Sequence, residues 1–201
     1  MAKSPIEFWF DFSSGYAYFA AMAVDDLAAR HGREVSWRPY MLGVAFKKTG
    51  VRGLSSTPMK SDYARLDWAR LARRTGLPFQ PPANHPIVQL PASRAYYWVE
   101  ETAPEKTHDF GRALFHAYFA EARDLADPAV VAAVGAEVGL PAAGIEAGLA
   151  SEPMKAKLKA ASDEAISKNV FGSPFFLCDG EPFWGFDRMD MLEEWLETGG
   201  W

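Results

Sequence analysis

Two serines stand where this chain could bind an anion or a peptide-like ligand. Ser14 lies where an apolar, aromatic-rich segment, residues 6–12, passes into residues with helical spacing. A serine there can cap the helix, because its hydroxyl accepts a hydrogen bond from a free N–H of the first turn. The same hydroxyl could instead donate to a bound thiolate, which the positive end of a helix also favours. The spacing alone leaves both interpretations open.

In the second interpretation, Ser14 and the helix end would lower the pKa of a bound thiol enough to change its charge at neutral pH. A hydrogen bond to a charged group contributes about 1.5–3 kcal/mol, and a helix end adds about 0.3–1 kcal/mol. Because one pKa unit corresponds to about 1.36 kcal/mol, the two together would lower the pKa of a bound thiol by roughly 1–3. A thiol held beside Ser14 would then be largely ionised at neutral pH.

Ser173-Pro174 and Asp187-Arg188 offer further binding groups near the end of the chain. If the Ser173–Pro174 bond is cis, Ser173 turns its backbone N–H and C=O away from the sheet, where a peptide-like ligand could pair with them; a trans loop is the alternative. Asp187 can cap the last helix. Alternatively, Asp187 and Arg188 could hold the charged ends of a small zwitterion.

Several other polar residues carry weaker signals. Cys178 is the single cysteine, so an internal disulfide, a CxxC pair and a Cys-ligated zinc site are excluded, and no metal is expected. A lone cysteine in a strand usually serves packing. The histidines lack an acid or a nucleophile at motif spacing, which leaves a hydrolase triad unsupported. The cations around Lys47 form either a solvated surface or a binding site for an anionic substrate.

Composition restricts the class of protein. The chain has 201 residues, 49% of them hydrophobic, and a formal net charge of -5. That length suffices for a real core, and the acidic balance argues against nucleic-acid binding. No apolar run reaches the roughly 18–20 residues that a membrane helix needs, and Glu7 and Asp11 interrupt the first apolar run, unlike in a signal peptide. We therefore expect a soluble, cytoplasmic globular protein without nucleic-acid or membrane partners.

The elements that must position these residues follow a β-turn-α-β pattern, a helical block, and a ββα end. Residues 6–12 and 34–39 predict strands around a helix that starts near Tyr16 and runs to Leu27. Residues 42–57 read as a loop, and Asp179-Gly180 predicts a hairpin turn between strands 174–178 and 182–184. A last amphipathic helix starts near Asp187. Helices are predicted between these two parts over residues 62–75, 91–102, 105–123, 127–138, 142–150 and 153–169.

Four segments together resemble the 2-hydroxychromene-2-carboxylate isomerases, relatives of kappa-class glutathione transferases within the DsbA-like thioredoxin superfamily. The segments are FDFSSGYAYFA at 10–20, LGVAFKKTG at 42–50, PMKSDYARLDWARLA at 58–72 and VFGSPFFLCDGEPFWGFDRMDMLEEWL at 170–196. The resemblance implies an α/β, thioredoxin-like fold with an all-helical insertion domain. The glutathione-binding domain would comprise residues 1–45 and 165–201, and the insertion, residues 46–164, would contribute the substrate pocket.

The resemblance also implies roles for individual residues. Ser14 takes the place of the first cysteine of a redox CxxC, and Ala17 that of the second, so glutathione would supply the thiolate. Ser14 would be the catalytic residue, while Lys47 and Asn84 would face an aromatic substrate. The remaining residues would hold glutathione, and they are Ser173, cis-Pro174, Trp184, Gly185, Phe186, Asp187 and Arg188. Relatives are commonly dimeric, so a homodimer is expected.

Three positions depart from the family's pattern. Gly15 replaces a proline, Val51 replaces an asparagine that is frequent in kappa enzymes, and Phe186 replaces a polar residue. The expected function is a glutathione-dependent isomerase of an aromatic carboxylate. It would act by thiolate addition, ring opening, bond rotation and glutathione release, in a pathway of aromatic catabolism. The alternatives are a kappa-like glutathione transferase and a non-catalytic glutathione-binding module.

Overall fold

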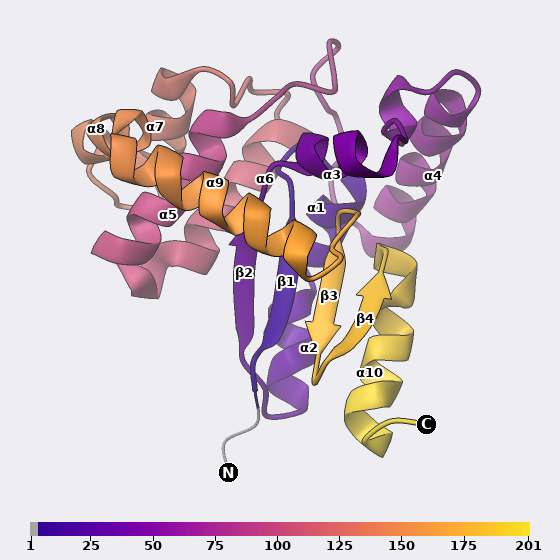
Figure 1. The fold of residues 1–201 in the computed structure, drawn as a ribbon. Coiled ribbons are helices and arrows are strands. Elements are labelled where there is room, and N and C mark those ends of the chain that lie inside the picture. Colours follow the sequence, from indigo (N-terminus) through magenta and orange to yellow (C-terminus); the bar gives the residue numbers. More distant parts are fainter. Residues whose placement is uncertain (1–3) are drawn as a thin grey trace.

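The computed structural model describes residues 4–201 and contains one four-stranded mixed sheet in the order β2-β1-β3-β4 (Figure 1). β1 runs parallel to β2 and antiparallel to β3, and β3 pairs antiparallel with β4. The strands are β1 (Ile6–Phe10), β2 (Val35–Pro39), β3 (Phe175–Cys178) and β4 (Glu181–Trp184). The Asp179-Gly180 turn has positive φ at both residues, 53° and 91°, as the hairpin prediction requires.

Helices connect the strands and form a block between β2 and β3. α1 (Gly15–Ala21) and α2 (Val24–Arg30) lie between β1 and β2, and α10 (Met189–Thr198) follows β4. The helices of the block are α3 (Leu42–Thr49), α4 (Lys60–Thr75), α5 (Leu90–Thr102), α6 (Thr107–Phe119), α7 (Pro128–Glu137), α8 (Ala142–Ala150) and α9 (Glu152–Ser167). Three short 3-10 turns complete the set: η1 (Leu54–Ser56), η2 (Pro104–Lys106) and η3 (Phe186–Arg188).

The alternation of side chains along β1 creates two hydrophobic clusters, one on each face of the sheet. Ile6, Phe8 and Phe10 point to the larger cluster, which includes α1, α2 and most of the helical block. Trp9 points to the other face, where it packs in a smaller cluster with Ala45 of α3 and Ala165 of α9.

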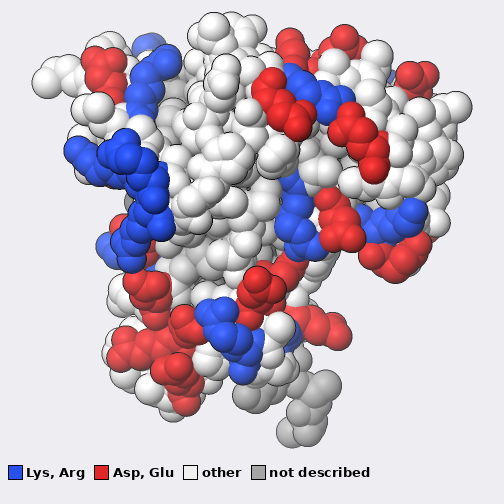
Figure 2. Space-filling model, turned by 180° about the vertical axis from the view of Figure 1, so that it is seen from behind, with Lys and Arg blue, Asp and Glu red and all other residues white. Residues whose placement is uncertain are grey.

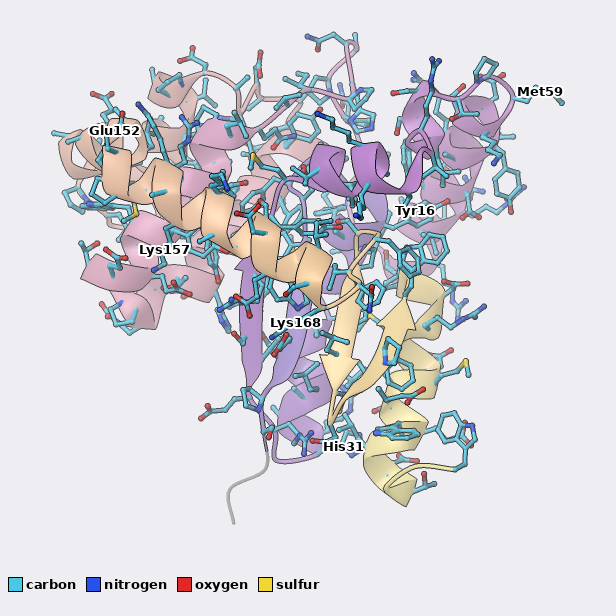
Figure 3. The ribbon with its side chains drawn as sticks, viewed as in Figure 1. Tyr16, His31, Met59, Glu152, Lys157 and Lys168 are labelled. Atoms are coloured by element: carbon cyan, nitrogen blue, oxygen red, sulfur yellow. The ribbon has the colours of Figure 1, made fainter. Side chains whose placement is uncertain are left out.

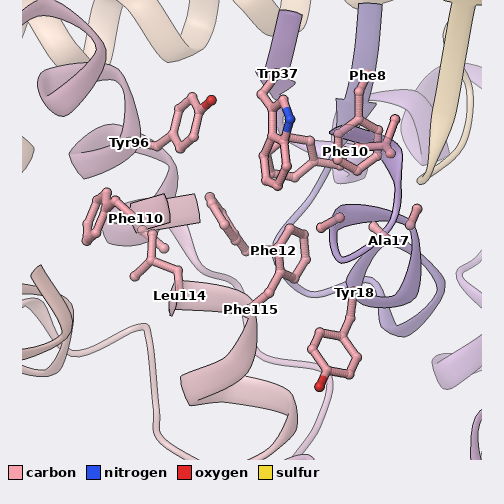
Figure 4. Close-up of a cluster of buried hydrophobic side chains, with 14 of the residues drawn as sticks. Phe8, Phe10, Phe12, Ala17, Tyr18, Trp37, Tyr96, Phe110, Leu114 and Phe115 are labelled. Atoms are coloured by element: carbon pink, nitrogen blue, oxygen red, sulfur yellow. The ribbon is translucent and has the colours of Figure 1, made fainter. Parts of the chain in front are cut away.

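The larger cluster is rich in aromatic rings and joins the sheet to the helical block (Figure 4). Phe12 is fully buried, with ring centroids 5.1 Å from Phe10 and 4.8 Å from Phe115 of α6. Trp37 of β2 stacks at 6.4 Å on Tyr96 of α5. The sheet and the inserted helices therefore share one core.

The predicted α/β pattern is confirmed, but two local predictions are wrong. Residues 42–49, predicted as loop, form α3, because the Asp11 carboxylate accepts the N–H of Leu42 at 3.0 Å and stabilises the first turn. The single helix expected from Tyr16 to Leu27 is two helices. The second begins at Val24, and Asp25 in its first turn accepts the indole N–H of Trp37 at 3.0 Å.

No helix among residues 4–201 is long and apolar enough to cross a membrane.

Candidate functional site

Ser14 lies at the start of α1, and its hydroxyl makes two hydrogen bonds. Its Oγ accepts the N–H of Ala17 at 3.2 Å, so the serine is the N-cap of α1. The same hydroxyl donates to the backbone C=O of Ser173 at 2.7 Å. The capping interpretation is thus correct, and the one hydroxyl proton joins two segments that the sequence analysis singled out separately.

Ser173 presents backbone groups beside Ser14. The Ser173–Pro174 bond is cis. The Ser173 Oγ accepts the N–H of Asp11 at 2.9 Å, which fixes this segment against the end of β1. No residue among 4–201 accepts the Ser173 N–H. This N–H is therefore available to a ligand next to the Ser14 hydroxyl.

Asp11 organises the loop before α1 and was missed by the sequence reasoning. Its Oδ1 accepts both the N–H of Ser13 at 2.9 Å and the Ser13 hydroxyl at 2.6 Å. Its Oδ2 accepts the N–H of Leu42, so one carboxylate joins the starts of α1 and α3. The only sequence signal was the Asp-x-Ser pattern of an Asx turn.

Gly15, one of the three departures from the family's pattern, is explained by Trp68 of α4. A Cβ added at Gly15 would lie 2.6 Å from Trp68 Cε2, so no larger side chain fits while the indole stays in place. Trp68 is 4% exposed, and its indole N–H has no partner among the described residues. Its ring also packs edge-on against His85, with ring centroids 5.4 Å apart. Trp68 thus contacts both the start of α1 and a second polar region.

Trp184 and Gly185 lie against the Ser173 segment. A Cβ on Gly172 would lie 2.0 Å from Trp184 Nε1, so the indole covers the backbone of Gly172. The N–H of Gly185 donates to the C=O of Pro174 at 3.1 Å. Gly185 has φ 111°, a conformation that favours glycine. The structure therefore brings Trp184, Gly185, Ser173 and Ser14 together.

The next three residues take different orientations. Phe186 packs against Phe19 of α1 at 5.8 Å, so its side chain joins the core. The prediction that Asp187 caps the last helix is wrong: α10 begins at Met189 after the turn η3, and its N-cap residue is Arg188, without a side-chain cap. Asp187 and Arg188 are exposed and pair with each other at 3.3 Å. Their charges are therefore accessible to a small ligand.

Lys47 and Asn84 lie elsewhere on the surface. Lys47 is exposed in the last turn of α3, and Asn84 is exposed in the segment between α4 and α5. Within residues 4–201, no hydrogen bond joins either side chain to Ser14. Their predicted contact with an aromatic substrate stays a prediction.

Tyr16, on the first turn of α1, faces α4 (Figure 3). Its hydroxyl donates to Asp67 at 3.0 Å. Burial, followed by this hydrogen bond, raises the pKa of Tyr16 well above its usual value. The charge of Asp187 contributes to the same rise, which places that carboxylate near the phenol. Tyr16 is therefore a neutral hydrogen-bond donor at every physiological pH.

Two hollows beside the 184–188 segment are large enough for a small polar ligand. Hollows of about 420 Å³ and 340 Å³ flank it, the first lined by Trp184 and Arg188 and the second by Phe186 and Asp187. From behind, Lys and Arg side chains gather along one side of the molecule and Asp and Glu below them (Figure 2). Charged residues of both signs line the second hollow, Arg74 and Asp190 among them.

Cys178 is the last residue of β3, at the opposite end of the strand from the Ser173 segment. It is fully buried on β3 and accepts from Arg33 Nη2 at 3.3 Å. Burial raises the pKa of this thiol above its usual value. The only cysteine is therefore not a reactive thiol of the Ser14 region, where the unpaired donors suit a ligand that carries its own nucleophile.

Comparisons with known proteins place this geometry in a family. The model of the DSBA-like thioredoxin domain matches residues 5–197. A 2-hydroxychromene-2-carboxylate isomerase of Sphingobium xenophagum is 28% identical over 193 residues, covering 95% of this chain and 97% of its own. One of Pseudomonas putida is 28% identical over 192 residues, covering 94% and 92%.

A solved structure agrees with these sequence matches. A 2-hydroxychromene-2-carboxylate isomerase superposes with a TM-score of 0.87 at 25% identity, over 96% of this chain and 94% of the other. The resemblance and the fold class expected from the four sequence segments are therefore confirmed.

Proposed function

The chain belongs to the DSBA-like thioredoxin domain family, and from this premise we propose that it is a glutathione-dependent isomerase of an aromatic carboxylate. The relatives are named as isomerases, which supports the proposal that this chain is an enzyme. The reaction would resemble that of 2-hydroxychromene-2-carboxylate isomerase, in which the substrate ring opens and a bond rotates.

The observation that carries the proposal is the pairing of Ser14 with the Ser173 backbone at a site without a cysteine. A thiol–disulfide oxidoreductase needs an attacking thiolate, and the chain's one cysteine is buried on β3. Ser14 offers a hydroxyl instead, beside the unpaired Ser173 N–H. These groups suit a ligand that brings both a thiol and a peptide backbone, as glutathione does.

The residues around Ser14 fit each part of such a ligand. In the structure the Ser14 proton is bonded to the Ser173 C=O, and a thiolate would compete for it with the advantage of a full charge. The N–H groups of Gly15 and Tyr16, which no described residue accepts, are further donors. Asp187 and Arg188 would hold the charged γ-glutamyl end, and Trp184 would cover the peptide.

When bound, glutathione would supply a nucleophile that adds to the conjugated substrate and later leaves, so it would be a cofactor rather than a co-substrate. Ser14 would keep this sulfur ionised. Lys47 would hold the substrate carboxylate, and Asn84 would contact the aromatic part. Phe186 packs on Phe19, so its side chain offers no polar contact to glutathione. The contact that a polar residue would make there would be missing or would come from the backbone.

The test compares two serine caps. Ser151 caps α9 much as Ser14 caps α1: its Oγ accepts the N–H of Met154 and donates to the C=O of Gly148 at 2.7 Å. Turnover of 2-hydroxychromene-2-carboxylate is followed by its ultraviolet spectrum, with and without glutathione. We expect Ser14→Ala to lower turnover by about 10²-fold, from the loss of a charged hydrogen bond, and Ser151→Ala to retain it.

Four results would contradict the proposal. Turnover that does not need glutathione would exclude the cofactor, and equal effects of the two variants would reduce Ser14 to a cap. A stoichiometric glutathione adduct in the mass spectrum would identify a transferase instead. Glutathione binding by calorimetry without turnover of this substrate would indicate a binding module.

A further inference from the structure

A group of largely buried polar side chains lies against Trp68 of α4. We call it the His85 cluster, and it consists of Ser55, His85 and Tyr118, with the backbone N–H of Ile87. Ser55 belongs to η1, His85 and Ile87 to the segment before α5, and Tyr118 to α6. Three parts of the helical block therefore meet in one hydrogen-bonded group.

Within the His85 cluster, the direction of each hydrogen bond follows from Tyr118. Its oxygen accepts the N–H of Ile87 at 3.2 Å, and its own proton needs an acceptor because the residue is fully buried. The amide of Gln89 lies near the phenol but makes no hydrogen bond of acceptable geometry. The acceptor among residues 4–201 is therefore His85 Nδ1, at 3.0 Å. A ring nitrogen that accepts is unprotonated, so the neutral imidazole carries its proton on Nε2.

The His85 ring is held in the neutral form that this direction requires. It is 7% exposed, and burial, aided by the charge of Arg65, lowers its pKa to about 4. Tyr118 keeps its proton as well, since burial raises its pKa to about 12. The tautomer is therefore fixed over the physiological range.

The consequence falls on Ser55. His85 Nε2 lies 3.2 Å from Ser55 Oγ and donates to it, so the Ser55 hydroxyl proton is left without an acceptor among the described residues. Ser55 is half-buried, hence in reach of a ligand. Leu54, which precedes it, and Val88, three residues after its partner His85, are apolar and 43% and 73% exposed. Ser55 is therefore a donor with a free proton on a segment that exposes apolar side chains.

The surroundings of Ser55 connect it to the proposed site. His85 packs on Trp68, which lies against Gly15 at the start of α1. A Cβ built on Gly53 would lie 3.0 Å from Cε2 of Phe46 of α3. The end of α3, which carries Lys47, therefore lies next to η1. Gln89 adds a second unsatisfied group: its amide is 3% exposed and both of its polar atoms lack partners among residues 4–201.

We propose that Ser55 donates its hydroxyl proton to an anionic oxygen of the aromatic ligand, and that His85 and Tyr118 are positioning residues that aim it. Leu54 and Val88 would contact the flat ring, and Lys47 would supply the charge that balances the carboxylate. This inference rests on the proposed function for the class of ligand, an aromatic carboxylate. It adds a specificity group on η1, away from the glutathione contacts.

The experiment uses salicylate as the probe and salicylamide as its uncharged counterpart, titrated by calorimetry into the full chain. Ser56, exposed on the same 3-10 turn and without a side-chain hydrogen bond among the described residues, provides the matched control. We expect Ser55→Ala to weaken salicylate binding about tenfold and salicylamide binding less, because the lost bond is charge-assisted. Ser56→Ala should bind both within twofold of the unaltered chain.

Two further readouts separate positioning from folding. Nitrogen NMR of the imidazole should show His85 as the neutral Nε2–H tautomer, and Tyr118→Phe should release that tautomer while weakening salicylate binding. His85→Gln, which keeps a donor near the Nε2 position, should retain more affinity than His85→Leu.

Absence of salicylate binding, equal behaviour of Ser55→Ala and Ser56→Ala, or an Nδ1–H tautomer would overturn the inference. Glutathione titrated into the same proteins distinguishes the two proposals. Its affinity should be unchanged by Ser55→Ala, and a chain that binds salicylate through Ser55 but not glutathione would refute the proposed function alone.

Discussion

At the residue scale, the contact between Gly15 and Trp68 shows how one departure from a family pattern is compensated by a neighbour. The family's proline and the indole of Trp68 would occupy overlapping space at the first position of α1. Glycine lacks the preset φ of proline, but its missing Cβ allows the indole of Trp68 to pack against the start of the helix.

This contact predicts a coupled pair of substitutions. Gly15→Ala should destabilise the protein by about 1–3 kcal/mol, because its Cβ overlaps the indole. In the Trp68→Leu background, which leaves space there, the same change should be neutral or stabilising. Urea unfolding of the four proteins measures the coupling, and equal costs in both backgrounds would contradict the contact.

His85 predicts a pH dependence of stability. Its folded pKa of about 4 lies below the value of about 6.5 expected in the unfolded chain, so the unfolded state binds more protons between these values. Stability is then lost as the pH falls from about 6.5 to 4, by about 3 kcal/mol in total.

The measurement is the difference in unfolding free energy between the unaltered chain and His85→Gln across this range. His116→Gln, on the same helix as Tyr118 but half exposed, controls for the loss of an imidazole. A difference between the unaltered chain and His85→Gln that does not change with pH would show that His85 titrates normally.

At the element scale, the arrangement of strands and most helices was predictable because each carries its own local pattern. β1 is a short aromatic run, and Asp179-Gly180 supplies the turn between β3 and β4. α3 was not predictable, because its start has no capping side chain of its own and depends on Asp11, 31 residues away. A helix whose start depends on a distant residue carries no local sequence signal for that start.

The same distinction applies to the site. Ser14, Ser173 and Asp187 were singled out because each stands at the boundary of an element. Asp11 was missed because its partners become visible only in three dimensions, and the role of His85 depends on Tyr118, 33 residues away. The incorrect cap at Asp187 arose because the chain inserts the turn η3 before α10.

Asp11 supports a prediction at this scale. Asp11→Ala removes the acceptor of two backbone N–H groups and of the Ser13 hydroxyl, at the starts of two helices. We expect a loss of about 2–3 kcal/mol in urea unfolding. Asp26→Ala, an exposed carboxylate in the first turn of α2, should cost below about 1 kcal/mol. A similar cost for both would deny Asp11 its linking role.

At the scale of the whole molecule, the shared aromatic core joins the sheet and the helical block into one unit. Phe12 contacts Phe10 of β1 on one side and Phe115 of α6 on the other. Because neither part has a separate core on this face, they should unfold together.

Phe12→Ala tests this cooperativity. The substitution should lower the unfolding free energy by about 3–5 kcal/mol, as expected for deleting a fully buried phenylalanine. Far-ultraviolet circular dichroism follows the helices and near-ultraviolet dichroism follows the aromatic packing. Both transitions should shift by the same amount, whereas helices that outlast the aromatic signal would indicate two independently stable parts.

The bond from Ser14 to the Ser173 carbonyl spans 159 positions of the chain. During synthesis the groups opposite Ser14, from Ser173 to Arg188, are therefore added at least 159 residues after it. A nascent chain that ends before β4 therefore has no complete cleft, whatever the ligand concentration in its surroundings. Ligand binding can therefore stabilise only chains that already contain these residues. A small thiol ligand would stabilise the folded state late in synthesis and would not assist early folding.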